Sequence, residues 1–274
     1  MPWPIRADAA PFKKHAGAAR TSSSVVTTTL TASASINTYG TYVSLGTTPS
    51  DRRTHGLLMW VTVTGSTGTD TNMCVTLRTV SGSGTIIVSD FYIGSQLQLM
   101  AYYLPITVLP NTAIYGAVKC GTGSRTAGVG FDFCTSGEWV NAPGGFSRIT
   151  CYGNVNSGGT QVTAHASANT YTTTPVELTA STTYPMRGFM FFHTPTPGTT
   201  TAESCLWSLM RGGAGSEVEF ADRTATTATT ETVINRWPGG LWQACDIPSS
   251  TRLSTRLACS TGGKIHGAML YGLS

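Results

Sequence analysis

Seven cysteines are the residues of this sequence best suited to chemistry, and an odd number leaves at least one outside any set of internal pairs. Three of them, Cys134, Cys151 and Cys245, lie in or beside segments rich in Gly, Asn and Ser, so we expect them to be accessible. A leftover cysteine favours a bond to a second chain. Cys134, Cys151 and Cys245 are therefore candidates for an intermolecular disulfide, in an assembly exposed to an oxidising exterior.

The other four cysteines, Cys74, Cys120, Cys205 and Cys259, occupy matching positions of an internal repeat. Strand alternation places Cys120 and Cys259 on apolar faces. Because free cysteine is among the most buried residue types, we expect four buried thiols, with a disulfide inside each repeat as the alternative. No Cys-x-x-Cys pair occurs and no two histidines have the spacing of metal ligands, so the sequence predicts no metal site and no cofactor.

The remaining reactive residue types predict that the chain is not an enzyme. Catalysis needs a nucleophile with a base, or two carboxylates at a defined distance. The 13 carboxylates are sparse, and several, such as Glu203 and Asp246, fall in or next to predicted turns. His193 and His266 fit ordinary packing roles in strands. We therefore expect no catalytic residues, and a sandwich-fold glycosidase is the enzymatic alternative.

Composition and charge exclude several classes of partner. Charged residues make up 11% of the chain, against roughly 25% in an average soluble protein. Hydrophobic residues at 40% exclude a disordered chain. The net charge of +4 comes from scattered basic residues, so no direct nucleic-acid partner is expected. No apolar run reaches about 18 residues, which excludes a membrane span, and the first residues lack the apolar core of a secretory signal. We expect synthesis in a cytosol.

Short alternating runs separated by Gly, Pro, Asn and Ser begin near residue 27 and predict strands, and no window predicts a helix. The pattern occurs twice, in the same order. A one-residue gap places Cys74 on Cys205, and an insertion further on places Cys120 on Cys259. The matching segments are SINTYG (35–40) with SANTYT (167–172), GLLMWVTV (56–63) with GFMFFHTP (188–195), and LPNT (109–112) with IPSS (247–250).

This pattern predicts an all-β chain made of two tandem β-sandwich domains of jelly-roll or related Greek-key type. We place the first sandwich at residues 25–134 and the second at residues 161–274, with an extended N-terminal arm at residues 1–24. The connector, residues 135–160, carries apolar side chains that a flexible linker would not need. We expect it to pack on one domain or on a partner.

The N-terminal arm mixes apolar and basic side chains, with three prolines and no hydrophobic period. A frayed terminus is the alternative to a functional arm. A mixed strip of this kind is suited to docking on a neighbouring subunit. The candidate docking residues are Trp3, Arg6, Phe12, Lys13 and Lys14.

The stretch YYLPITVLPNTAIYGAVK (102–119), which follows GLLMWVTV and the hairpin SGSGTIIVSDFYIG, resembles a sandwich domain that recurs in structural proteins of tailed bacteriophages. In that family an IPAGS-like corner precedes the next strand, and here the corners are LPNT and IPSS. The resemblance covers most of the first repeat. The second repeat departs from it where NRWPGGLWQACD (235–246) replaces the aromatic-Pro-Ile strand. Members of the family occur in collars, necks, tails, fibres and capsid decorations and are not enzymes.

The resemblance implies a structural component of a tailed-phage particle, a neck or collar protein first, with capsid decoration or a tail or fibre part as alternatives. Its expected partners are copies of itself and other virion proteins from the neck, tail or capsid, in a symmetric homo-oligomer. A carbohydrate-binding module for the host surface is the alternative of a different class. The tryptophans available for glycan contact are Trp139, Trp207, Trp237 and Trp242, although alternation with Leu209 turns Trp207 inward.

Overall fold

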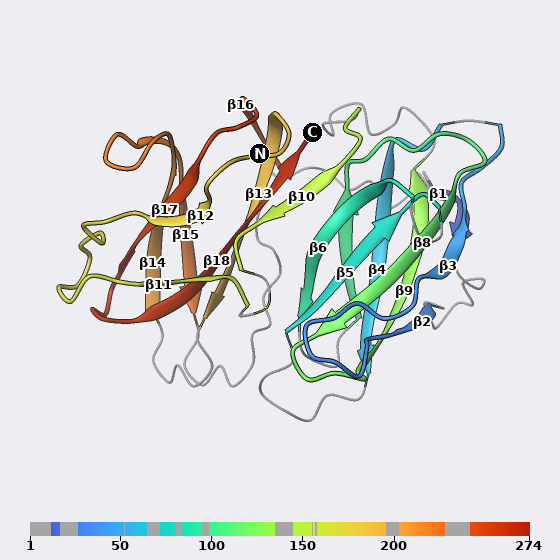
Figure 1. Ribbon diagram of the computed structural model, residues 1–274, viewed down its shortest axis with the longest axis horizontal. Coiled ribbons are helices and arrows are strands. Elements are labelled where there is room, and N and C mark those ends of the chain that lie inside the picture. The colour runs from blue at the N-terminus through green and yellow to red at the C-terminus, as the bar shows by residue number, and fades with distance from the viewer. Residues whose placement is uncertain are drawn as a thin grey trace.

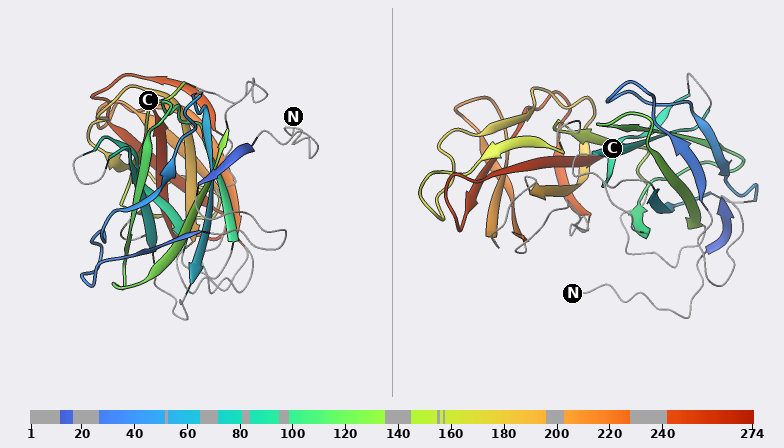
Figure 2. Two further views of the ribbon diagram at one scale, coloured as in Figure 1. Left: turned by 90° about the vertical axis from the view of Figure 1, so that its right-hand side faces the viewer. Right: turned by 90° about the horizontal axis from the view of Figure 1, so that it is seen from below.

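The computed structural model describes residues 12–16, 27–51, 53–64, 72–80, 84–94, 99–134, 145–154, 156, 158–195, 203–227 and 242–274. Within these ranges the chain forms strands and no named helix, in two lobes that lie side by side (Figure 1 and, seen from below, Figure 2). No helix in the described ranges is long and apolar enough to cross a membrane. The predicted all-β class is confirmed.

In the described residues, the eight strands β2 to β9 of the first repeat form a sandwich of two antiparallel sheets, with four of these strands in each. One sheet has the order β2-β9-β4-β7 and the other has the order β6-β5-β8-β3. Each sheet turns an apolar face toward the other, as the predicted alternation requires. The strands are β2 (Thr28–Thr31), β3 (Val43–Thr47), β4 (Gly56–Thr64), β5 (Met73–Arg78), β6 (Ile86–Gly94), β7 (Leu99–Leu104), β8 (Ala113–Cys120) and β9 (Thr126–Cys134).

The second repeat has the same strand order, β11-β18-β13-β16 in one sheet and β15-β14-β17-β12 in the other. In each repeat the first, eighth, third and sixth strands therefore share a sheet, which is the jelly-roll arrangement. The predicted pair of jelly rolls is confirmed. The strands are β11 (Thr160–Thr163), β12 (Val176–Thr179), β13 (Met186–Pro195), β14 (Glu203–Arg211), β15 (Val218–Thr227), β16 (Gln243–Ile247), β17 (Leu253–Cys259) and β18 (Ile265–Leu273).

Several backbone hydrogen bonds recur at matching positions of the two repeats. The backbone N–H of Asn37 donates to the carbonyl of Cys120 at 2.8 Å, and Asn169 donates to Cys259 at 2.7 Å. Both asparagines have a positive φ, 56° and 55°, which asparagine tolerates better than most residues. Each predicted corner also contains a residue with positive φ, Asn111 at 54° one residue after its proline and Ser250 at 59° two residues after its proline.

One short strand of the connector joins the two repeats. Strand β10 (Ile149–Tyr152) pairs antiparallel with β18 and, at Ile149 opposite Val88, parallel with β6. One sheet of each repeat, β6-β5-β8-β3 and β11-β18-β13-β16, thereby becomes part of a single nine-stranded sheet, with β10 between the lobes (Figure 1). The connector therefore packs on both domains, where the sequence predicted packing on one domain or on a partner.

An aromatic cluster fills the junction between the repeats. The outer face of β13 and β18 joins the core of the first repeat through Met190, Phe192, Met269, Tyr271 and Leu273. The ring of Phe91 lies 5.7 Å from that of Phe192 and 4.9 Å from that of Tyr271, between centroids. The Tyr271 hydroxyl accepts a hydrogen bond from the backbone N–H of Tyr92 at 2.9 Å. The lobes are thus joined by apolar packing as well as by strand pairing.

The N-terminal arm contributes one strand to the first sandwich. Strand β1 (Phe12–Ala16), which contains Lys13 and Lys14, pairs antiparallel with β9 of the same chain. Trp3 and Arg6 lie outside the described residues. The expected docking of the arm on a neighbouring subunit stays a prediction.

Candidate functional site

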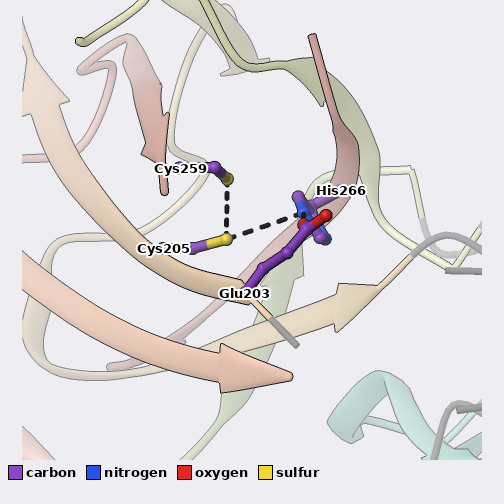
Figure 3. Close-up of side chains that lie close together, drawn as sticks. All are labelled: Glu203, Cys205, Cys259 and His266. Atoms are coloured by element: carbon purple, nitrogen blue, oxygen red, sulfur yellow. Dashed lines mark hydrogen bonds and ion pairs between the residues drawn. The ribbon is translucent and has the colours of Figure 1, made fainter. Parts of the chain in front are cut away.

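Four side chains able to bind metal meet inside the second repeat (Figure 3). They are Glu203, Cys205, Cys259 and His266, and one ligand atom from each lies within 4.8 Å of the others. All four residues are buried, with at most 2% of their surface exposed. This is the one group of its kind in the described part of the chain.

Strand geometry brings the four side chains together. Glu203 and Cys205 are two residues apart on β14, so both point to the same side of their sheet. Cys259 lies directly opposite Cys205 on β17. His266 belongs to β18, in the facing sheet of the sandwich. The cluster therefore spans both sheets of the second repeat.

The buried carboxylate has cationic and imidazole neighbours. Glu203 Oε2 lies 2.9 Å from His266 Nε2, and Glu203 Oε1 lies 3.2 Å from Lys264 Nζ. The other ring nitrogen of His266, Nδ1, lies 3.1 Å from His193 Nε2. A carboxylate with no exposed surface is retained in a folded protein only with such partners.

The two thiols are close enough to share a proton. Cys205 Sγ lies 2.7 Å from Cys259 Sγ and 3.6 Å from His266 Nε2. The hydrogen bond between the two sulfurs, with His266 nearby, lowers the pKa of Cys259. The same hydrogen bond together with burial raises the pKa of Cys205. One thiolate can therefore form while the other sulfur keeps its proton.

Sequence comparison of the repeats misplaced one cysteine. Met73 faces Cys120 across β5 and β8 as Cys205 faces Cys259, so Met73 and not Cys74 is the counterpart of Cys205. The one-residue gap that aligned the cysteines was wrong, because such a shift moves a side chain to the opposite face of the sheet. The alternative of a disulfide in each repeat fails for the first, where Cys74 is opposite Lys119.

The four cysteines that the sequence had matched, Cys74, Cys120, Cys205 and Cys259, are nevertheless buried thiols, as predicted, with 1–2% of their surface exposed. Glu203, predicted to lie in or next to a turn, is the first residue of β14 and is buried. The search for a metal site by spacing along the chain missed this cluster because its members come from three strands. Alternation of Glu203 and Cys205 along one strand was the one available signal.

The candidate disulfide cysteines are less accessible than expected. Cys134 has 1% of its surface exposed, because it ends β9 between β1 and β4, so the expectation of access was wrong for it. Burial raises the pKa of the Cys134 thiol to about 12. Cys151 and Cys245 are partly buried, and burial raises the pKa of each, that of Cys245 to about 11. The intermolecular disulfide stays a prediction.

Of the four tryptophans considered for glycan contact, the two in the described residues pack against other parts of the protein. Trp207 is fully buried beside Leu209, as alternation predicted. Trp242 is partly buried and donates its indole N–H to the carbonyl of Tyr103 at 2.9 Å, across the two repeats. Trp139 and Trp237 lie outside the described residues. The glycan-binding alternative stays a prediction.

A shallow surface hollow lies beside β2 and β3. Its lining, within the described residues, contains hydroxyl groups and one aromatic ring but neither a carboxylate nor a histidine. These groups could contact a polar partner but supply no general base. The lining residues are Thr29, Thr31, Ala32, Ser33, Tyr39, Gly40, Thr41 and Val43.

Comparisons with known proteins add little to this description. No protein-family model and no curated protein matches the chain. Among solved structures, the N-terminal CBM22-1-CBM22-2 tandem domain of Xyn10C from Paenibacillus barcinonensis is similar over 85% of this chain and 82% of that one. The sequence identity is 9% and the TM-score is 0.22, and a likeness this weak supports no conclusion about function.

Proposed function

We propose that the chain is a structural component of a tailed-phage particle, most specifically a neck or collar protein that binds copies of itself and other virion proteins. Capsid decoration and a tail or fibre part are the alternatives within the same class. The bacteriophage assignment is supported by the resemblance of residues 102–119 and their upstream strands to the phage sandwich domain. The role as a scaffold is supported by how the repeats are fastened together.

The main observation behind this proposal is that β1 lies at the same place on the first repeat as β10 does on the second repeat. Phe12 lies opposite Cys134, which pairs with the first residue of β4. Ile149 lies opposite Leu273, which pairs with Gly188 of β13, the counterpart of Gly56. The free edge of β10 joins β6, the fifth strand of the neighbouring jelly roll. By the same geometry the free edge of β1 would join the fifth strand of another jelly roll.

Strand β15 is the fifth strand of the second repeat and lies at the end of its sheet. In the described part of the chain, β1 pairs only with β9 and β15 pairs only with β14. We infer that β1 of one copy joins β15 of the next, because an unpaired strand edge is a template for another strand. Such head-to-tail contact closes into a ring or continues as a filament, and a ring is what a neck or collar requires.

A backbone substitution in β1 tests this contact on the full-length chain. Lys14→Pro removes a backbone N–H and disfavours strand pairing, whereas the matched control Lys14→Ala keeps the N–H. Light scattering after size exclusion is expected to show an oligomer for the wild type and for Lys14→Ala, and a smaller species for Lys14→Pro. Equal sizes for all three proteins would remove the proposed contact.

The virion assignment has its own test. Electron micrographs of purified phage particles labelled with an antibody against this chain are expected to show label at the head–tail junction. Label on the head surface or on the tail would support the alternatives instead. Particles that carry no label, from an infection in which the chain is made, would exclude a virion role.

A further inference from the structure

We propose that Glu203, Cys205, Cys259 and His266 bind a structural Zn²⁺ ion inside the second repeat. The inference is independent of the proposed virion role. The four residues offer two sulfurs, one imidazole nitrogen and one carboxylate oxygen, all buried and within 4.8 Å of one another. Zn²⁺ binds these three ligand types, and structural zinc sites are four-coordinate and closed to solvent.

The orientation of His266 suits a metal ligand. Its Nε2 faces Glu203 Oε2 at 2.9 Å and Cys205 Sγ at 3.6 Å, while its Nδ1 faces His193 Nε2 at 3.1 Å. When Nδ1–H donates to His193, the lone pair of Nε2 is directed into the cluster. A ligating histidine usually donates its second ring N–H in this way, which fixes the tautomer. His193 is therefore the positioning residue of the site.

The charges of the site balance when zinc is bound. Two thiolates and one carboxylate carry three negative charges, and an unpaired buried charge is strongly unfavourable. The ion contributes two positive charges, and Lys264, whose Nζ lies 3.2 Å from Glu203 Oε1, contributes the third. Binding releases the protons that remain on the two thiols, so it weakens as the pH falls.

The sulfur separation is intermediate between those of the two possible fates of the cysteine pair, a disulfide bond and shared binding of a zinc ion. The 2.7 Å between Cys205 Sγ and Cys259 Sγ lies between a disulfide bond of about 2.05 Å and the roughly 3.7 Å that separates two sulfurs bound tetrahedrally at about 2.3 Å from zinc. A small displacement of either strand reaches one or the other. A disulfide would use only the cysteines and would leave Glu203 and His266 without a shared ligand.

Comparison with the first repeat shows whether the residues around Cys205 and Cys259 fit a zinc site or a disulfide. There Met73 replaces Cys205, and Ala127, which pairs with Val63 as His266 pairs with Pro195, replaces His266. The second repeat therefore differs from the first by a cysteine and a histidine at one place, beside the cysteine that both repeats share. A metal site needs both the additional sulfur of Cys205 and the imidazole of His266. A disulfide would need the sulfur but not the imidazole.

The test measures metal in the reduced full-length chain. The protein is purified with a non-thiol reductant and equimolar ZnSO₄, freed of weakly bound metal, and analysed by mass spectrometry of the elements. One zinc per chain is expected, together with a rise in Tm over the chelator-treated protein. Replacement by Co²⁺ is expected to give the thiolate charge-transfer absorption and the d–d bands of a tetrahedral site.

Variants locate the ion. Cys205→Met with His266→Ala copies the first repeat and is expected to fold without zinc, and Glu203→Gln is expected to weaken zinc binding by at least tenfold. Cys120→Ala, at the matching position of the first repeat, is the control and is expected to keep one zinc per chain. Zinc-free reduced wild-type protein, a Cys205–Cys259 disulfide that persists in the reductant, or unchanged zinc content in the double variant would each overturn the proposal.

Discussion

The two repeats place different side chains on the same backbone. In the first repeat Met73 faces Cys120 and Ala127 lies nearby in the opposite sheet, so this place is apolar. In the second repeat Cys205, Cys259 and His266 take the corresponding positions, and Glu203 joins them. The backbone hydrogen bonds around both places correspond. The jelly roll thus depends on its ladders and corners, while the side chains at this end of the core are free to differ.

The outer faces of the matching sheets differ in a second way. On the second repeat Phe192 and Tyr271 lie under the first repeat and pack on Phe91. On the first repeat Trp60 and Asp132 hold the corresponding positions, and the indole N–H of Trp60 donates to Asp132 Oδ2 at 2.9 Å. One face therefore packs on an apolar neighbour, and the other carries a hydrogen-bonded polar pair in which Asp132 is buried.

Removing the aromatic contact of the junction is expected to have the largest effect. Phe192→Ala deletes a ring that is 4% exposed, and buried Phe→Ala changes lower the free energy of unfolding by about 3–5 kcal/mol. Denaturant unfolding of the wild type should show one transition, because the repeats share this core. The variant should show two transitions, one for each repeat.

The matched control for the junction is Trp60→Phe. It gives the first repeat the phenylalanine that the second repeat has at the corresponding position, Phe192. It should keep a single transition. If Phe192→Ala also unfolds in one step with a loss below about 1 kcal/mol, the junction does not couple the repeats.

The buried threonines at the corners should matter equally in both repeats. Thr48 Oγ1 accepts from the backbone N–H of Thr112 at 2.9 Å, and Thr182 Oγ1 accepts from that of Thr251 at 3.1 Å. Thr48→Val and Thr182→Val each leave that N–H without its acceptor, so each should lower the free energy of unfolding by about 2 kcal/mol.

Chemical denaturation of the two threonine variants checks the equivalence of the corners. The exposed Thr29→Val is the control and should change stability by less than about 0.5 kcal/mol. A loss at one corner and none at the other would show that the matching hydrogen bonds have unequal roles.

The smallest effect should be a loss of stability at alkaline pH that comes from Cys134, the last residue of β9. The second repeat has no titratable group at the corresponding position. Burial and the nearby Asp132 carboxylate raise the pKa of Cys134 to about 12, from about 8.5 in an unfolded chain. Stability from this group is complete below pH 8.5 and is lost as the pH rises toward 12, amounting to about 1.4 kcal/mol at pH 9.5. Leu273, at the corresponding position, has nothing to titrate.

Comparison of Cys134→Ala with the wild type isolates that response. The loss of stability between pH 7 and pH 9.5 should be smaller in the variant by about 1.4 kcal/mol, and the constant effect of the smaller side chain drops out of this difference. Equal losses in the two proteins would mean that Cys134 is already accessible to water.

The sequence predicted the architecture well because its signals are local. Alternating runs, Pro corners and the repeated Asn-Thr-Tyr turns each describe a few adjacent residues, and the order of these segments determines the jelly roll. Strand β10 was missed because four residues inside a Gly-rich connector carry no period long enough to detect. It forms because it supplies a partner to the edges of two other strands.

The candidate site was missed for a different reason. Glu203 and His266 are brought together by strands from two sheets, so their meeting depends on register, which the sequence does not state. The gap that matched Cys74 to Cys205 shows how sensitive this is, since one residue reverses the face. The accessibility expected for Cys134 failed similarly, because neighbours on both sides of β9 cover it.

The hydrogen bond from Tyr92 to Tyr271 spans 179 positions of the chain, and this separation has a consequence for synthesis. The first jelly roll can form on the ribosome long before β18 emerges, and until then the edge of β6 and the side of the Phe91 ring that contacts Phe192 and Tyr271 are uncovered. Contacts so distant in sequence form late, and bare strand edges are where nascent chains associate wrongly. In a crowded cell, the slow arrival of the final strand is therefore the vulnerable interval in making this protein.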